Sequence, residues 1–191
     1  SSEFLRSVQS FESTRVAVIG DVMLDIWLEG PVRRISQEAP IPVVELTGRE
    51  ESPGGAANVA ELLASLGATV SLLGVVGQDD EASALREAVR STKITARFVG
   101  DEGRPTTTKT RVVSGTQQIC RLDVEDRSPA VPSIESEMIE AVPEALDGAD
   151  AVIISDYGKG ALTEKVVDAI LSRTLTGEQP TVVDPNGPDA T

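Results

Sequence analysis

Short apolar runs alternate with helical segments along most of this chain, and this alternation constrains its fold more than any other feature. The apolar runs at 15–20, 70–76, 151–155 and 180–184 are typical of buried strands, and helical spacing of apolar residues covers 59–66, 81–92, 133–146 and 163–175. Strands that alternate with helices form βαβ units, in which helices cover a parallel sheet. We therefore predict an α/β fold, in which Ser133 caps the third helix.

Two segments depart from this alternation. Residues 31–51 and 106–126 are polar, rich in β-branched residues and alternating in character. The second segment predicts a hairpin that turns at Ser114 and Gly115. We interpret both segments as parts of one small antiparallel sheet that projects from the main sheet as a lid or an interface; the alternative is two extra strands at the edge of the main sheet. The predicted domains are an α/β core of 1–30, 52–105 and 127–191 and a β lid of 31–51 and 106–126.

Composition excludes several classes of function. The 191 residues include 17 basic and 31 acidic side chains, so the net charge of −14 argues against binding to nucleic acid or to an anionic membrane. Histidine is absent and Cys120 is the only cysteine, which excludes Ser-His-Asp catalysis, histidine-ligated zinc and an internal disulfide. No apolar run approaches the ~20 residues that span a bilayer and no signal-peptide pattern is present, so we expect a cytoplasmic protein.

The run SPGGAANVAELLASLG, residues 52–67, is the strongest indication of a ligand. Gly54 and Gly55 allow the backbone to approach a ligand without an intervening Cβ. The helix that follows begins with unpaired N–H groups at the positive end of its dipole, which suits a hydroxyl-rich or anionic ligand. Asn58 adds an amide that both donates and accepts, as sugar hydroxyls require. The alternative is a glycine-rich turn that only caps a core helix.

Polar residues also follow three of the predicted strands. Asp25 comes five residues after the strand-ending Gly20, Asp156 and Lys159 follow the strand at 151–155, and Asp184 and Asn186 follow the last strand. Ligands of open α/β sheets bind outside the carboxyl ends of the strands. Each group alone could be a cap or a turn. Their common position, beside the Gly-Gly helix start, favours a binding site.

Five segments together resemble one protein family. The segments VAVIGDVMLD, RRISQEAPIPVVEL, SPGGAANVAELLASLGA, TKTRVVSGTQQICRLDVED and ISDYGKGAL look like the N-terminal part of the ribokinase-like (PfkB) carbohydrate kinases. Within that family they are most similar to the branch that phosphorylates heptose 7-phosphate at C1 in ADP-heptose biosynthesis. The resemblance implies a ribokinase-like fold, a parallel-type sheet flanked by helices with a small antiparallel β lid, and a sugar kinase activity.

The resemblance also implies roles for individual residues. The acidic residue that holds sugar hydroxyls matches Asp25, and the di-glycine motif that binds the sugar matches Gly54, Gly55 and Asn58. The lid cations that suit the 7-phosphate match Lys109 and Arg111. Asp156 and Lys159 match the strand end that lines the sugar side, and Asp184 and Asn186 match the strand end where sugar and nucleotide phosphates meet.

The catalytic motifs of that family are missing from these 191 residues. An Asn-x-x-Glu motif for magnesium and a Gly-Ala-Gly-Asp motif, which supplies the anion hole and the aspartate base, belong to the second half of such kinases, and neither occurs up to Thr191. We therefore expect the N-terminal portion of a kinase, with no catalytic residue and no metal ligand of its own. ATP and Mg²⁺ would serve the intact enzyme and would not bind tightly to this chain alone.

Other expectations concern partners and alternative functions. By analogy with relatives, the β lid implies a homodimer, and the partner ligand is a sugar phosphate. The alternative function is a non-catalytic module for sugar-phosphate binding or dimerisation. A nucleotide-binding oxidoreductase is disfavoured, because the turn from Gly20 to Met23 lacks the G-x-G-x-x-G spacing.

Overall fold

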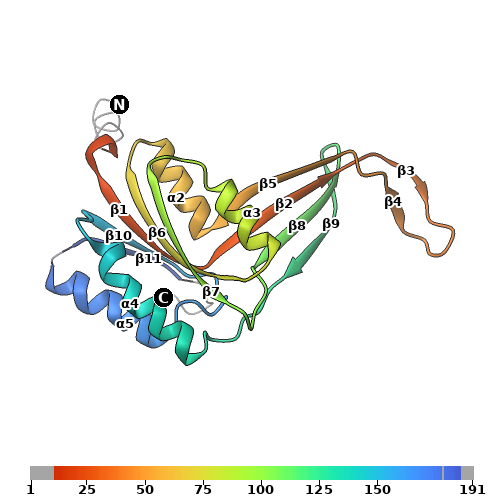
Figure 1. The fold of residues 1–191 in the computed structure, drawn as a ribbon. Helices are drawn as coiled ribbons and strands as arrows, with labels where there is room; N and C mark the ends of the chain where they lie inside the picture. The colour runs from red at the N-terminus through yellow and green to blue at the C-terminus, as the bar shows by residue number, and fades with distance from the viewer. Residues whose placement is uncertain (1–10, 178, 186–191) are drawn as a thin grey trace.

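The computed structural model describes residues 11–177 and 179–185, in which a helix-flanked sheet carries a second sheet on one side (Figure 1). A 3-10 turn at Phe11–Ser13 precedes the first strand. The main sheet is parallel throughout, in the order β11-β10-β1-β6-β7. Its strands are β1 (Arg15–Gly20), β6 (Thr69–Gly77), β7 (Ile94–Asp101), β10 (Ala151–Ser155) and β11 (Thr181–Asp184). The predicted α/β fold is confirmed.

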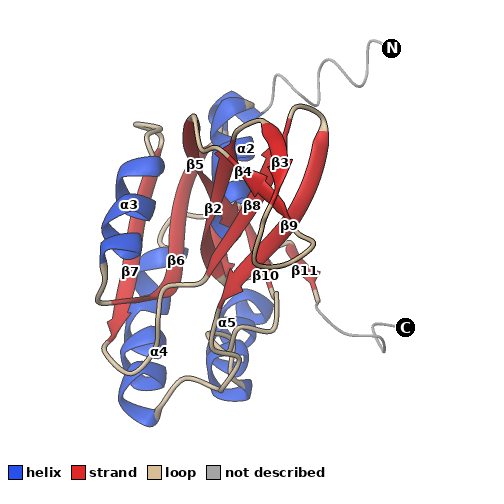
Figure 2. Cartoon of the chain, turned by 90° about the vertical axis from the view of Figure 1, so that its right-hand side faces the viewer, coloured by secondary structure: helices blue, strands red, loops and turns tan. Residues whose placement is uncertain are grey.

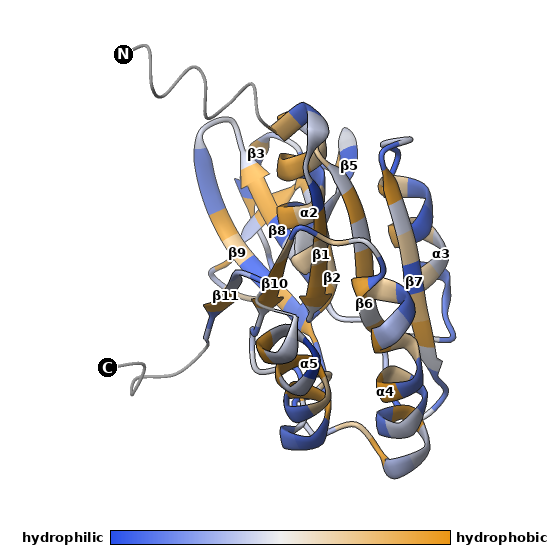
Figure 3. Cartoon of the chain, turned by 90° about the vertical axis from the view of Figure 1, so that its left-hand side faces the viewer, coloured by the Kyte–Doolittle hydropathy of each residue, from blue (hydrophilic) through white to orange (hydrophobic). Residues whose placement is uncertain are grey.

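Helices cover both faces of the main sheet, as Figure 2 shows. One face packs against α2 (Ala56–Ser65) and α3 (Asp80–Ala88), and the other against α4 (Pro132–Leu146) and α5 (Glu164–Thr176). Val18 of β1 faces the first pair of helices, and Ile19 faces the second pair. Strands buried on both faces need apolar residues at every position, which explains why β1 and β10 are hydrophobic along their length in Figure 3.

Helices α3 and α5 begin within one residue of the predicted starts at 81 and 163, whereas the predicted cap of α4 differs. Asp79 caps α3 by accepting from the N–H of Ala82 at 2.8 Å, and Thr163 caps α5. The predicted Ser133 cap is wrong, because α4 begins at Pro132 after Val131 and has no side-chain cap. Proline suits the first helical position, since its fixed φ is already helical and its missing N–H would have had no partner there.

A second, four-stranded sheet extends from the core in the order β5-β2-β8-β9, and we call it the lid sheet. It contains β2 (Val22–Glu29), β5 (Gly48–Gly55), β8 (Thr108–Ser114) and β9 (Gln117–Val124). The predicted hairpin of β8 and β9 is confirmed, and Gly115 in its turn has φ +58°. β2 pairs antiparallel with β5 and parallel with β8. β3 (Val32–Ile35) and β4 (Pro42–Val44) pair separately, as an arm beyond the sheet in Figure 1.

The lid sheet thus differs in extent from the predicted lid. Residues 22–29 and 52–55 were predicted to belong to the core, but they form β2 and the second half of β5. Segment 31–51 supplies the arm and the first half of β5. The physical reason is that β2 belongs to both layers. Leu24 and Ile26 are buried in the core beside α2, while Asp25, Trp27 and Glu29 point to the opposite face. Because its inward residues are apolar and buried, the sequence of β2 is typical of a core strand, and the sequence therefore predicts it as part of the core.

The strand β7 was not predicted from the sequence. The predicted helix over 81–92 is too long, because α3 ends at Ala88 and a strand starts at Ile94. As an edge strand, β7 needs few apolar residues: Val99 is buried, whereas Arg97 is exposed and pairs with Glu144 of α4. Among the described residues, no helix is both long and apolar enough to cross a membrane.

Candidate functional site

The two sheets meet at Asp21, the residue between β1 and β2. Its N–H donates to the carbonyl of Ser155 at the end of β10, and its carbonyl accepts from the N–H of Ala56 at the start of α2, both at 3.0 Å. Gly55 has φ +56°, and a Cβ there would lie 2.3 Å from the Asp21 carbonyl oxygen. Glycine is therefore required at this helix start, because the backbone of Asp21 lies directly against it.

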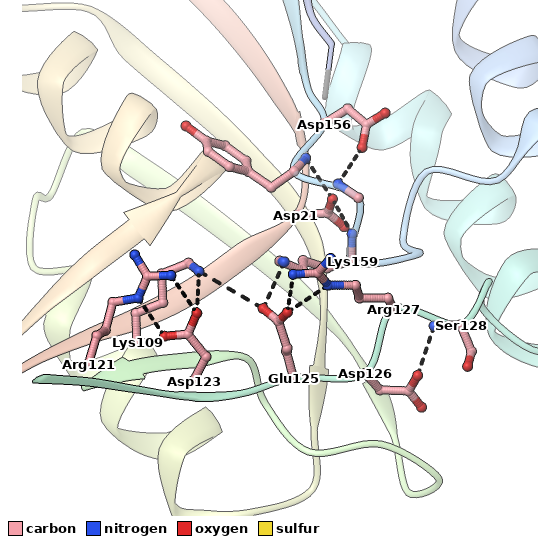
Figure 4. A network of polar contacts seen from close by, with 12 residues as sticks. Asp21, Lys109, Arg121, Asp123, Glu125, Asp126, Arg127, Ser128, Asp156 and Lys159 are labelled. Carbon is pink, nitrogen blue, oxygen red and sulfur yellow. Dashed lines mark hydrogen bonds and ion pairs between the residues drawn. The ribbon is translucent and has the colours of Figure 1, made fainter. Parts of the chain in front are cut away.

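The carboxylate of Asp21 shapes the loop at 156–161, which we call the Lys159 loop. Its Oδ2 accepts from the N–H groups of Tyr157 and Lys159 at 2.9 Å each (Figure 4), and its Oδ1 accepts from that of Ala161 at 3.2 Å. The side chain is only 2% exposed. Burial raises the pKa of Asp21, and the three N–H donors offset part of that rise. Asp21 was not among the predicted site residues, although an acid directly after a buried strand end was a usable signal.

Asp25 of β2 and Gly54 of β5 are diagonal neighbours, because Asp25 pairs with Ser52 and Gly54 pairs with Met23. A Cβ on Gly54 would lie 2.7 Å from Cγ of Met23 and 2.8 Å from Oδ2 of Asp25. The missing side chain therefore leaves a carboxylate oxygen accessible from the side of β5. Oδ1 of the same carboxylate accepts from Nη1 of Arg111 at 2.6 Å. The structure thus brings together three of the predicted site residues.

Arg111 is held on two sides. Beyond its bond to Asp25, its guanidinium lies over the ring of Trp27, 4.9 Å from the centroid. In the sheet register Asp25 is opposite Lys109 and Trp27 is opposite Arg111, so these four side chains share one face of the lid sheet. The stacked and paired guanidinium keeps further N–H donors in its plane, an arrangement that suits a phosphate or carboxylate ligand.

A ladder of ion pairs joins the lid sheet to the Lys159 loop (Figure 4). Lys109 lies 3.2 Å from Asp123 and 3.9 Å from Glu125, and the ammonium of Lys159 lies 2.7 Å from Glu125. Arg121 bonds Asp123, and Arg127 bonds the second oxygen of Glu125. The hydrogen bond from Lys159 lowers the pKa of Glu125, and that from Arg121 lowers the pKa of Asp123. Each cation is therefore held in a fixed position by a carboxylate.

The other predicted residues lie outside this group. Asn58 is exposed in the first turn of α2. Asp156 accepts from the N–H of Gly158 in its own loop at 2.7 Å, which is a turn-forming contact, and its N–H donates to the carbonyl of Asp184 at 2.9 Å. The side chain of Asp184 is exposed at the end of β11, and Asn186 lies outside the described residues. The roles of all these residues remain predictions.

The described part of the chain does not form a magnesium site. Within it, no group of three or more histidine, cysteine, aspartate or glutamate side chains is arranged to hold a metal ion. The acids near Asp25 are bound by arginine and lysine instead, so the residues present do not fit a metal, and the geometry gives no step that passes through one.

The chain is similar in sequence to known carbohydrate kinases. The pattern of the pfkB family carbohydrate kinases matches residues 13–191. The chain is 46% identical over 184 residues to the bifunctional protein HldE of Aeromonas hydrophila subsp. hydrophila, and 44% identical to that of Shewanella sediminis. Both matches cover 96% of this chain but only 38% of the relative's length.

Solved structures show the same fold at lower identity. A possible 1-phosphofructokinase of Thermotoga maritima superposes with a TM-score of 0.68 at 18% identity, over 90% of this chain and 53% of the other. A ribokinase of Arabidopsis thaliana, solved with ribose and ATP, superposes with a TM-score of 0.60 at 16% identity, over 93% of this chain and 55% of the other. The chain therefore spans about half of the solved chains it matches.

Proposed function

Because this chain belongs to the pfkB family of carbohydrate kinases, we propose that it forms the sugar-binding part of an ATP-dependent kinase that phosphorylates heptose 7-phosphate at C1. The observation that carries this proposal is the Asp25 carboxylate left accessible by Gly54, beside the oriented guanidinium of Arg111. The identity of 44–46% to two HldE proteins supports the heptose branch.

Each part of the proposed site has a chemical task. Oδ2 of Asp25 accepts from sugar hydroxyls, and the N–H groups at the start of α2 donate to sugar oxygens. Arg111 and Lys109 bind the phosphate, because a forked guanidinium and a neighbouring ammonium suit a tetrahedral anion. Lys159 approaches from the core side of the same ion-pair ladder. The sugar would thus be held between the lid sheet and the carboxyl ends of β1 and β10.

Binding by Arg111 is tested by calorimetric titration with D-glycero-D-manno-heptose 7-phosphate. Loss of a charge-assisted contact is expected to cost about 1.5–3 kcal/mol, so Arg111→Ala should bind at least about tenfold more weakly than wild type. Arg49→Ala is the matched control, because Arg49 is also an ion-paired arginine of the lid sheet, bonded to Glu51 of its own strand, β5. Equal affinity of Arg111→Ala and wild type would contradict the assigned role.

We further propose that the catalytic base, the magnesium ligands and most of the ATP site are supplied by residues outside these 191. The match to only 38% of the length of the two HldE proteins supports this part. Phosphoryl transfer depends on positioned donors and Mg²⁺ around the moving group. We expect no sugar-dependent release of ADP from MgATP by this chain, together with measurable sugar-phosphate binding. Sugar-dependent turnover would overturn this division of the site.

The proposal includes pairing of two copies through the lid sheet. Leu122 and Val124 are 55% and 51% exposed, and they alternate along β9 with Arg121 and Asp123, so they form an apolar strip on the face away from the ion-pair ladder. Light scattering should give the mass of a dimer for wild type and of a monomer for Leu122→Asp. A wild-type monomer at tens of micromolar would contradict the pairing.

A further inference from the structure

A buried ion pair lies at the start of the connection from β7 to β8. Nε of Arg104 donates to Oδ2 of Asp101 at 2.8 Å, and both side chains are only 7% exposed. Oδ1 of Asp101 accepts from the N–H of Gly103 at 2.8 Å, which closes a tight turn. Separating a buried pair of this kind would leave an uncompensated buried charge, which is strongly destabilising, so the two side chains are held together. The pair therefore anchors the incoming connection of the lid sheet, residues 102–107.

The rest of the Arg104 guanidinium reaches two other segments. Nη2 donates to the carbonyl of Ser128 at 3.2 Å, on the outgoing connection of the lid sheet, residues 125–131, which leads to α4. Nη1 donates to the carbonyl of Lys159 at 3.0 Å, in the Lys159 loop. The outgoing connection and the Lys159 loop also contact each other directly, because the N–H of Ala130 donates to the carbonyl of Gly160 at 2.9 Å. One planar side chain thus joins both connections of the lid sheet and the Lys159 loop.

Lys159 is fixed from three directions by three charged side chains. Its N–H donates to Asp21, its carbonyl accepts from Arg104, and its ammonium pairs with Glu125. Its side chain is 8% exposed. Glu125 itself belongs to the outgoing connection, so the position of the ammonium and the position of the lid sheet depend on the same contacts.

Gly160 shows how closely these segments pack. Its φ is +81°, and a Cβ there would lie 2.0 Å from the carbonyl oxygen of Ser128. The Lys159 loop and the outgoing connection therefore approach each other as backbone against backbone, with no side chain between them. A small shift of either segment must be followed by the other, because well-packed contacts of this kind do not deform gradually.

From these contacts we infer that Arg104 is a positioning residue, which holds the two connections of the lid sheet and the Lys159 loop in one geometry and so places the Lys159 ammonium beside Lys109 of the lid sheet. The inference rests on the proposed function only where it assigns Lys159 to the sugar-phosphate site. Arginine is needed here because only its planar fork reaches a carboxylate and two carbonyls at once.

The first test uses the wild-type chain without any ligand. Hydrogen exchange followed at increasing urea concentrations reports the opening free energy of each amide. If Arg104 joins the three segments, amides of 102–107, 128–130 and 157–161 should open together, with one shared urea dependence. Independent opening of the Lys159 loop and the outgoing connection would overturn the inference.

The second test compares Arg104→Lys with Arg97→Lys. Lysine keeps the positive charge beside Asp101 but offers a single point of contact. Arg97 is the control, because it is an exposed, ion-paired arginine on β7, the strand that ends at Asp101. The chain has four lysines, at 93, 109, 159 and 165, so their ¹³Cε signals can be assigned. In Arg104→Lys the Lys159 signal should shift and the amides of Lys159 and Ala161 should exchange roughly tenfold faster or more, with Lys93 and Lys165 unchanged. Unchanged Lys159 signals in a folded variant would overturn the inference.

A titration with heptose 7-phosphate separates this inference from the proposed function. If wild type binds and Arg104→Lys binds roughly tenfold more weakly while Arg97→Lys does not, Arg104 positions Lys159 for the ligand. If Arg104→Lys shifts Lys159 and still binds as wild type, the placement of Lys159 has no role in recognition and that part of the inference fails. If wild type itself does not bind, the proposed function fails, and the coupling of the three segments is judged by exchange alone.

Discussion

Replacing Asp21 by alanine should destabilise the fold more than any other single change at an acidic residue of the site. The change removes the acceptor of three backbone N–H groups, and the bonds of Lys159 and Ala161 are buried, so water cannot replace the carboxylate there. Each unsatisfied buried donor costs about 1–3 kcal/mol. Relief of the buried charge, whose pKa is raised by burial, offsets part of this cost. We expect a net loss of about 3 kcal/mol in the free energy of unfolding, a large share of the roughly 5–15 kcal/mol typical of a domain.

Asp21→Asn makes the same prediction sharper. Its amide oxygen can still accept from Tyr157 and Lys159, but its NH₂ group would face the N–H of Ala161, so a loss of about 1–2 kcal/mol is expected. Urea denaturation at pH 7, followed by circular dichroism, should rank wild type above Asp21→Asn and Asp21→Ala last. Asp168→Ala, an exposed position on α5, is the control and should change little. If Asp21→Ala loses no more stability than Asp168→Ala, the role assigned to Asp21 is refuted.

Two further predictions concern the lid sheet. Gly54→Ala should cost about 1–3 kcal/mol of stability by overpacking against Asp25 and should abolish sugar-phosphate affinity. Gly48→Ala is the control and should bind normally, because its Cβ would lie 3.7 Å from its nearest neighbour. Urea denaturation and calorimetry measure the two effects, and normal binding by Gly54→Ala would contradict the proposed site. Glu125→Gln should remove an acid-sensitive part of the stability. Because the folded-state pKa of Glu125 is lowered by Lys159, its contribution is present above the ordinary glutamate pKa and is lost as the pH falls through the lowered value. Urea midpoints between pH 3 and pH 7 should converge for wild type and Glu125→Gln at the acid end, and a constant difference would refute this.

The main sheet was predictable because its central strands are buried on both faces. Every residue of β1 from Val16 to Gly20 is buried, and such a run leaves a clear signal in the sequence. β7 has no continuous apolar run, because an edge strand is partly exposed and can contain polar residues such as Arg97. β2 was assigned to the core for a related reason: its inward residues, Leu24 and Ile26, belong to the core, although its outward residues form the site.

The sequence predicts residues of the candidate site but not the arrangement in which the structure places them. Gly54 and Asp25 stood out by type and position and Arg111 by the family resemblance, yet the bond between Asp25 and Arg111 joins residues 86 positions apart. It depends on the parallel pairing of β2 with β8, a contact between distant segments that local patterns do not encode. Asp21 and Arg104 were missed because the backbone groups that they bind, at Tyr157, Ser128 and Lys159, belong to loops remote in the sequence, so no local pattern marks these contacts.

The binding of a sugar phosphate to the lid sheet is tested most directly through Trp27. It is the only tryptophan of the chain and lies against Arg111, so its fluorescence reports the proposed phosphate-binding guanidinium. Titration with heptose 7-phosphate should give a saturable change, and the same sugar without its phosphate should need at least about tenfold higher concentration, because it lacks the charge-assisted contact. Equal response to both sugars, or no saturable response from the folded chain, would contradict the account.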